Sequence, residues 1–109
     1  MNHQYVLKDN TEIKGVVNNH QSVGNYAFAI YYQDADKPKV AVSVSKKIGN
    51  AVVRNHEKRR VREILRDALG IVGSRKMLIV VKSAVLGMDF EKEKDVLINL
   101  LSKVGRQNK

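Results

Sequence analysis

Cationic side chains are concentrated between positions 46 and 66, and the chemistry that they suit is the binding of phosphate groups. This stretch holds eight cations and two anions, so it carries +6 of the chain's net charge of +9. A phosphate backbone attracts such a surface whatever its base sequence, which predicts a polyanionic partner. The alternative is a solvated helix face with internal ion pairs. The cations are Lys46, Lys47, Arg54, Lys58, Arg59, Arg60, Arg62 and Arg66, and the anions are Glu57 and Glu63.

The spacing of these cations divides them between two sides of a helix predicted over residues 51–69. At about 100° per residue, Arg59, Arg62 and Arg66 fall within a narrow arc beside Asn55, on one flank of the apolar stripe. We expect them to form a basic ridge.

Arg54 and Lys58 point nearly along the apolar stripe, but they lie in the first turns, before that stripe begins. We expect both side chains to overhang the rim of a sheet, above a floor that includes Tyr31. Such a groove suits a single nucleic-acid strand, because phosphates take the cationic donors while a base stacks on the ring.

Three segments have the apolar spacing of amphipathic helices. The segment 9–11 offers capping oxygens to the first helix, Gly70 and Gly73 end the second, and Asp89 caps the third. The apolar stripes are Ile13, Val16 and Val17 in the first helix, Val61, Ile64, Leu65, Ala68 and Leu69 in the second, and Leu97, Leu100, Leu101 and Val104 in the third.

Three strands are expected over residues 22–32, 39–45 and 76–83. The first two strands alternate between a face of large apolar residues and a face of Ala, Ser and Tyr31, and we expect them to pair as an antiparallel hairpin. The large apolar residues are Tyr26, Phe28, Ile30 and Tyr32 in the first strand and Val40, Val42 and Val44 in the second. The bare second face is suited either to contact with a flat partner or to plain exposure to solvent. The element order is α-β-β-α-β-α, which predicts an α+β two-layer sandwich with helices packed on a small mixed sheet.

The remaining composition narrows the class of protein. A chain of 109 residues with 43% hydrophobic and 28% charged residues predicts one globular domain over 1–109. The absence of cysteine excludes disulfides, thiolate catalysis and Cys-based zinc sites. No apolar run approaches the ~18 residues of a membrane span, and residues 1–4 lack the pattern of a secretion signal, so we expect a cytoplasmic protein.

One stretch matches a known family over many positions. It comprises Ser43-Val44-Ser45-Lys46-Lys47-Ile48-Gly49-Asn50-Ala51-Val52, followed by Arg54-Asn55, Lys58-Arg59 and Arg62-Glu63. This stretch closely resembles the signature of the bacterial ribonuclease P protein family. Ser22-Val23-Gly24-Asn25, Phe28 and Tyr31 extend the resemblance, which weakens toward the C-terminus but covers roughly the whole chain.

The resemblance implies the ribosomal protein S5 domain 2-like fold, with a left-handed β-α-β crossover, and an enzyme subunit without catalytic residues. In that family the catalyst is an RNA subunit, and the protein helps to bind the 5′ leader of precursor tRNA and broadens the substrate range. Mg²⁺ is expected in the holoenzyme, bound mainly by RNA, and the metal-binding residues are not predicted. Neither a membrane nor an obligate protein partner is implied.

The resemblance also assigns residues to the two RNAs, with several serving both. The residues that it places at the 5′ leader are Ile13, Val17, Tyr31, Ser45, Lys46, Arg54, Asn55, Lys58 and Arg62. The residues that it places at the catalytic RNA are Lys47, Arg54, His56, Lys58, Arg59, Arg62 and Arg66.

This chain departs from the family pattern at two places. His56 stands where the family has a second arginine, so a permanent cation is replaced by a group with an ordinary pKa near ~6.5. Ile13 and Val17 stand where the first helix often carries two phenylalanines, so aliphatic contact with the leader replaces stacking.

Three other functions compete with this reading. The first is a protein nuclease that uses His20 and His56 as acid and base, with Asp34, Asp36 or the acidic run at 91–95 as metal ligands. Against it, Glu91, Glu93 and Asp95 fit a solvated first helical turn, favoured by the helix dipole, and nothing supplies a nucleophile. The second is a non-catalytic ribosomal-type RNA-binding protein. The third is a membrane-surface role, which a hidden apolar stripe disfavours.

Overall fold

The computed structural model describes residues 10–19 and 21–106, with side chains excepted at 10–12, 69, 72 and 106. The elements are α1 (Asn10–Asn18), β1 (Ser22–Gly24), β2 (Phe28–Asp34), β3 (Lys39–Val44), α2 (Ala51–Val72), β4 (Arg75–Val81), the 3-10 helix η2 (Ser83–Gly87) and α3 (Phe90–Arg106). The α+β class with a mixed sheet is confirmed. The expected strand over 22–32 is instead two strands, so the order is α-β-β-β-α-β-α.

The four strands form one sheet in the order β1-β2-β4-β3. β2 pairs with β1 and β4 in antiparallel fashion, whereas β3 pairs with β4 in parallel. The predicted hairpin between the strands at 22–32 and 39–45 is therefore wrong, because β4 lies between them. The apolar run Leu78–Val81 is what lets β4 take this central place, since it is buried on one face and half-buried on the other.

A tight turn at Asn25 separates β1 from β2. The Oδ1 atom of Asn25 accepts hydrogen bonds from the backbone N–H groups of Ala27 (2.9 Å) and Phe28 (2.8 Å). These bonds turn the chain back on itself, so Gly24 pairs with Ala29 across the turn. The alternation therefore restarts at Phe28, which leaves Tyr26 exposed although it was expected on the apolar face.

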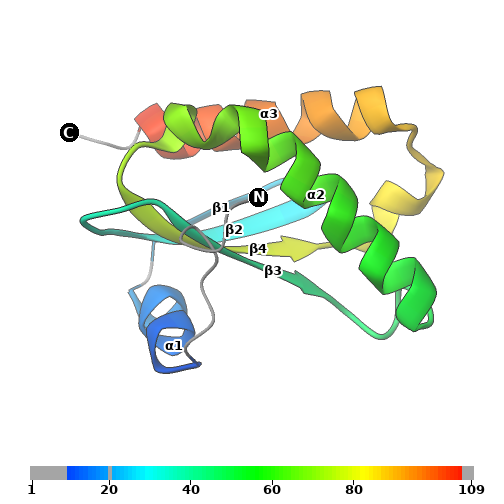
Figure 1. Ribbon diagram of the computed structural model, residues 1–109, viewed down its shortest axis with the longest axis horizontal. Helices are drawn as coiled ribbons and strands as arrows, with labels where there is room; N and C mark the ends of the chain where they lie inside the picture. The colour runs from blue at the N-terminus through cyan, green and yellow to red at the C-terminus, as the bar shows by residue number, and fades with distance from the viewer. Residues whose placement is uncertain (1–9, 20, 107–109) are drawn as a thin grey trace.

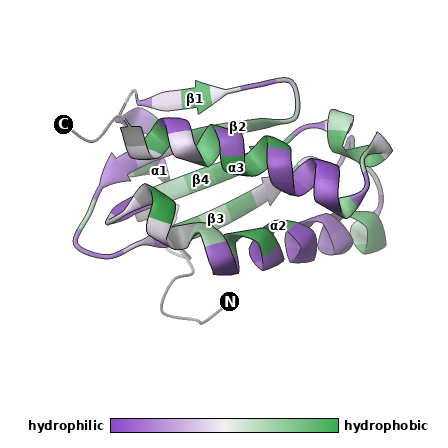
Figure 2. Cartoon of the chain, turned by 90° about the horizontal axis from the view of Figure 1, so that it is seen from above, coloured by the Kyte–Doolittle hydropathy of each residue, from purple (hydrophilic) through white to green (hydrophobic). Residues whose placement is uncertain are grey.

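The helices lie on both faces of the sheet. Figure 1 shows α2 and α3 above it and α1 below it. α3 contacts β1 and β2, α2 contacts α3 and β3, and α1 contacts β2 and β4. In Figure 2 hydrophilic residues follow the outer side of α2. The main core therefore fills the layer above the sheet, and the opposite face is covered in part by α1.

The crossover from β3 through α2 to β4 is left-handed, as the resemblance implied. In Figure 1, β3 and β4 both run to the right and α2 returns to the left above them, while Figure 2 shows that β4 lies behind β3 in that view. About 2% of such crossovers have this hand.

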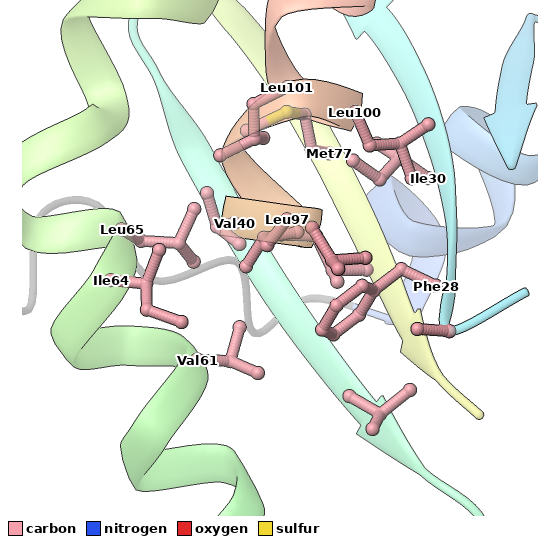
Figure 3. Packing of buried hydrophobic residues seen from close by; sticks show 14 of the residues in the cluster. Phe28, Ile30, Val40, Val61, Ile64, Leu65, Met77, Leu97, Leu100 and Leu101 are labelled. Carbon is pink, nitrogen blue, oxygen red and sulfur yellow. The ribbon is translucent and has the colours of Figure 1, made fainter. Parts of the chain in front are cut away.

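The core confirms the predicted apolar stripes. Figure 3 shows Val61, Ile64 and Leu65 of α2 pointing toward Leu97 of α3 and the sheet. Ala68, Leu100, Leu101 and Val104 are also buried, whereas the side chain of Leu69 and residue 9 lie outside the described part of the chain. The third helix is capped as expected, because Asp89 Oδ1 accepts a hydrogen bond of 2.8 Å from the Lys92 backbone N–H.

An ionic cluster joins α2 to α3. The Arg60 guanidinium lies 3.0 Å from Glu93 Oε1 and 3.9 Å from Glu57 Oε1, and it donates a 3.2 Å hydrogen bond to the Met88 carbonyl. Glu93 has no solvent-exposed surface, so the expectation that the acidic run 91–95 forms a solvated turn is wrong at this position. A sequence places Glu93 and Arg60 on different helices, and only the helix packing brings them together.

Candidate RNA interface

The loop between β3 and α2 fixes where the basic residues begin. Ile48 is buried and anchors the loop in the core, and the Ser45 hydroxyl accepts a 3.1 Å hydrogen bond from the Lys47 backbone N–H. A β-carbon on Gly49 would lie 2.9 Å from the Val53 side chain. Glycine is therefore required here by a close approach to the first turn of the helix.

Asn50 caps α2, a role that its residue type allows but that was not assigned from the sequence. Its Oδ1 accepts a 3.1 Å hydrogen bond from the Val53 backbone N–H, and its carbonyl accepts from Arg54. Capping of this kind stabilises a helix by about 1 kcal/mol. The loop and cap together leave Lys46 and Lys47 exposed at the end of the sheet where α2 begins.

The exposed side of α2 carries a shallow hollow of about 370 Å³. Lys58 is half-buried in it, whereas Asn55, Arg59 and Arg62 are exposed. Three cations against one carboxylate give this surface a positive charge that suits phosphate oxygens. The residues that line the hollow are Asn55, Lys58, Arg59, Arg62 and Glu63.

Arg66, the other predicted member of the basic ridge, and the remaining basic residues of α2 have different surroundings. Arg66 is exposed and forms an ion pair with Glu63, one turn away on the same helix. Arg60 belongs to the ionic cluster with Glu93 rather than to the basic surface. Arg54 is half-buried, and its buried Nε atom has no hydrogen-bond partner among the described residues. His56 is exposed outside the hollow.

The face of the sheet toward α1 holds the remaining predicted leader-binding residues. Tyr31 is half-buried and alternates with the buried Ile30 and Tyr32, so it points away from the main core. On α1, Val16 is fully buried against the sheet while Ile13 and Val17 are half-buried. None of these residues lines the α2 hollow.

Two residues on the α1 face were not singled out from the sequence. Leu78 of β4 stands between Tyr31 of β2 and Ala41 of β3 in the sheet register, and Val80 takes the same place between Ala29 and Ser43. Both are half-buried, so the floor is more apolar than Ala, Ser and Tyr alone would make it. The uninterrupted apolar run of β4 was the available signal, since it indicates a strand that packs on both faces.

The ligands proposed for a nuclease site do not come together. Within residues 10–19 and 21–106, no group of three or more His, Asp or Glu side chains is arranged to hold a metal ion. Glu93 is buried under Arg60, Asp34 is exposed, and His20 lies outside the described residues. None of the helices that the structure describes is long and apolar enough to cross a bilayer.

A small α+β domain with a cationic helix at the edge of a partly apolar sheet face defines the class of basic RNA-binding protein. Comparison with known proteins identifies the family within this class. The sequence model of the Ribonuclease P family matches residues 1–105. The chain therefore belongs to the ribonuclease P protein family, and its RNA-binding character and its place in a ribonucleoprotein follow from that membership.

Individual relatives agree with this assignment. The "Ribonuclease P protein component" of Mycoplasma mycoides is 38% identical over 108 residues, which cover 95% of this chain and 99% of the relative. That of Streptococcus gordonii is 34% identical over 93% of this chain and 87% of its own length.

Solved structures share the fold. The RNase P protein of Staphylococcus aureus superposes with a TM-score of 0.84 at 26% identity, over 91% of this chain and 94% of that one. The protein from Thermotoga maritima has a TM-score of 0.82 at 23% identity, over 89% and 94% of the two chains. The second likeness concerns the fold alone.

Proposed function

We propose that this chain assists a catalytic RNA in the endonucleolytic removal of the 5′ leader from precursor tRNA, by binding the leader and broadening the range of substrates. The observation that carries the proposal is the clustering of Asn55, Lys58, Arg59 and Arg62 on the exposed side of α2, in a chain of the ribonuclease P protein family. The chain itself supplies positioning and charge, and the RNA supplies the reaction.

The proposal assigns the two surfaces to two RNAs. The single-stranded leader crosses the α1 face, where Tyr31 offers a ring for stacking and Ile13 and Val17 offer aliphatic contact. Arg54 and Lys58, the cations in the first turns of α2, bind the phosphates of the leader. Arg59, Arg62 and Arg66, together with Lys47, face the catalytic RNA, and Arg66 can exchange its exposed pair with Glu63 for a phosphate because such pairs are worth ~1 kcal/mol or less.

Mg²⁺ serves the holoenzyme in this proposal and is held mainly by RNA. The side chains of the chain lower the repulsion between the leader and the catalytic RNA, which reduces the Mg²⁺ concentration that the complex needs. The proposed setting is the cytoplasm, with the RNA subunit and precursor tRNA as partners and without a membrane or an obligate protein partner.

Reconstitution tests the proposal. The purified chain is combined with a bacterial ribonuclease P RNA, and cleavage of precursor tRNA is followed at a Mg²⁺ concentration at which the RNA alone is slow. We expect strong stimulation by the complex and no cleavage by the protein alone. Failure to stimulate would contradict the proposal in favour of a ribosomal-type binding role, and cleavage by the protein alone that His56→Ala abolishes would favour a protein nuclease.

A further inference from the structure

The turn between β1 and β2 is closed by hydrogen bonds and presents Tyr26 to solvent. Tyr26 is 60% exposed, while the next two residues, Ala27 and Phe28, are fully buried. Asn25 closes the turn, because its Oδ1 accepts from both of those residues and its backbone N–H donates to the Phe28 carbonyl at 2.9 Å. A single exposed tyrosine needs no explanation by itself. This one is held outward by fixed neighbours on both of its flanks.

A cation is fastened to the same turn. The backbone N–H of Lys82 donates a 2.9 Å hydrogen bond to the Ala27 carbonyl, which extends the pairing of β4 with β2 by one step. The Lys82 ammonium donates a 2.7 Å hydrogen bond to the carbonyl of Asn25, which belongs to the peptide that leads into Tyr26. A lysine ammonium has three donors, so two remain for a phosphate group.

The turn lies at the same end of the sheet as the start of the basic stretch. Phe28, Val81 and Val44 stand in one row across β2, β4 and β3. Neighbouring strands are about 4.8 Å apart, so the backbone of β3 enters its basic loop roughly 10 Å from the Tyr26 turn. Figure 1 shows that β3 and β4 end where α2 begins. Lys46 and Lys47 therefore share this end with Lys82 and Tyr26.

We propose that Tyr26 is a stacking platform for a nucleobase of single-stranded RNA, with Lys82 binding the adjoining phosphate. The inference deepens the proposed function and rests on it, since it presupposes that the chain binds RNA. An exposed ring costs little conformational entropy to use, and a base stacks on it without being identified, while the neighbouring ammonium holds the backbone. The base belongs either to the leader or to an unpaired segment of the RNA subunit.

A fluorescent reporter tests the contact directly, because the chain contains no tryptophan. Tyr26→Trp places a single indole on the turn, and stacking on a base quenches its emission. Quenching on addition of the RNA subunit assigns the base to that RNA. Quenching only when the reconstituted complex binds precursor tRNA, and not mature tRNA, assigns it to the leader. Unchanged emission in all three complexes would overturn the inference.

Asn99→Trp is the matched control, because Asn99 is exposed on α3, a helix that carries acids and bases together rather than an excess of cations. We expect its emission to stay constant in the same titrations. Equal quenching at both positions would mean that the signal comes from RNA nearby in general, and it would overturn stacking at Tyr26.

Affinity measurements supply an independent readout. Tyr26→Ala should weaken binding of the RNA that quenches the reporter by roughly 5- to 150-fold, the range expected for loss of one stacked base, whereas Tyr26→Phe should bind as the wild type does. Circular dichroism checks that the alanine variant is folded. Equal affinity of the alanine variant and the wild type would overturn the inference, as would an equal loss in the phenylalanine variant.

The proposed function is judged separately in these experiments. If the wild-type complex cleaves precursor tRNA but the emission of the Tyr26→Trp variant does not change, the stacking role of Tyr26 is wrong and the proposed function is still supported. A wild-type chain that does not stimulate the RNA removes the proposed function itself.

Discussion

Glu93 is a carboxyl group whose surroundings oppose ionisation. Its burial between α2 and α3 raises its pKa from 4.5 to about 8, and a hydrogen bond to Glu57 and the charge of that second carboxylate act in the same direction. Arg60 opposes the shift but does not cancel it. At neutral pH the folded protein therefore retains a proton on Glu93.

Glu93→Gln should remove a pH dependence from the stability of the protein. Between pH 4.5 and about 8 the unfolded chain has released a proton that the folded chain retains, so rising pH favours unfolding by up to ~1.4 kcal/mol per pH unit. This contribution to stability is complete below pH 4.5 and is lost as pH rises through about 8. Glutamine mimics the protonated form at every pH.

Urea unfolding of both proteins between about pH 5 and pH 9 measures this difference. The variant should gain stability relative to the wild type as pH rises, with little further change above about pH 8. A difference between the two proteins that stays constant with pH would contradict the assignment of the proton to Glu93.

Tyr31→Ala should weaken the holoenzyme's binding of precursor tRNA and leave mature tRNA unaffected, because only the precursor has a leader to stack on the ring. Loss of one stacked base corresponds to ~1–3 kcal/mol. Tyr31→Phe keeps the ring and serves as the control, and thermal unfolding checks the fold, because Tyr31 is half-buried in β2. Equal losses for precursor and mature tRNA would show that Tyr31 does not contact the leader.

At the scale of elements, the helices could be predicted from the sequence more fully than the sheet. The buried face of a helix can be predicted from residues close together in the sequence, because the helical period is local. The spacing of Val61, Ile64 and Leu65 is an example. Strand pairing is not local. The chain reaches β4 only after α2, and nothing in the run Leu78–Val81 says which strands it will join. The division at Asn25 depends on side-chain hydrogen bonds that alternation does not reveal.

Prediction of the candidate interface was limited in the same way: spacing within one helix could be predicted, but contacts between elements could not. The helical projection correctly grouped Asn55, Arg59 and Arg62 on one side of α2, where they line the hollow. It was wrong to separate Lys58 from them, because Lys58 lines the same hollow. It could not show that Arg60 would turn inward, because its partner Glu93 lies on α3. Tyr26 was also expected on the buried side. It is exposed because the Asn25 side chain forms hydrogen bonds that turn the chain at this point, and strand alternation does not reveal such a turn.

The crossing of α2 and α3 depends on a glycine. A β-carbon at Gly105 would overlap the carbonyl oxygen of Ile71, and backbone cannot move aside as a flexible side chain can. Gly105→Ala should therefore destabilise the protein by ~1–3 kcal/mol. Gly70→Ala is the matched control, because Gly70 is also helical and a β-carbon there meets no atom of the described residues within 4 Å.

The control should be stabilised by up to ~1 kcal/mol, since alanine is the better helix former. Chemical denaturation of both variants measures the two changes. If both substitutions change the free energy of unfolding equally, then helix propensity, and not the contact with Ile71, determines the change.

For the whole molecule, the distribution of charge matters more than its sum. Most of the net charge of +9 arises between residues 46 and 66, so one side of the domain attracts RNA while α3 carries acids and bases together. Diffusional encounter with RNA is steered by that asymmetry. The sheet holds the cations of the loop and of α2 at fixed positions. RNA that is attracted by the net charge can therefore bind in one defined orientation.

The salt dependence of assembly separates docking from general attraction. Each phosphate that the protein neutralises adds about 0.7 to 0.9 to the slope of log affinity against log salt. Arg59→Ala combined with Arg62→Ala should therefore weaken binding to the RNA subunit and reduce that slope by about 1 to 2. Lys92→Ala combined with Lys103→Ala removes the same charge from exposed positions on α3 and should leave the slope nearly unchanged. Equal reductions in the two double variants would mean that net charge alone governs assembly and that the α2 surface has no special role.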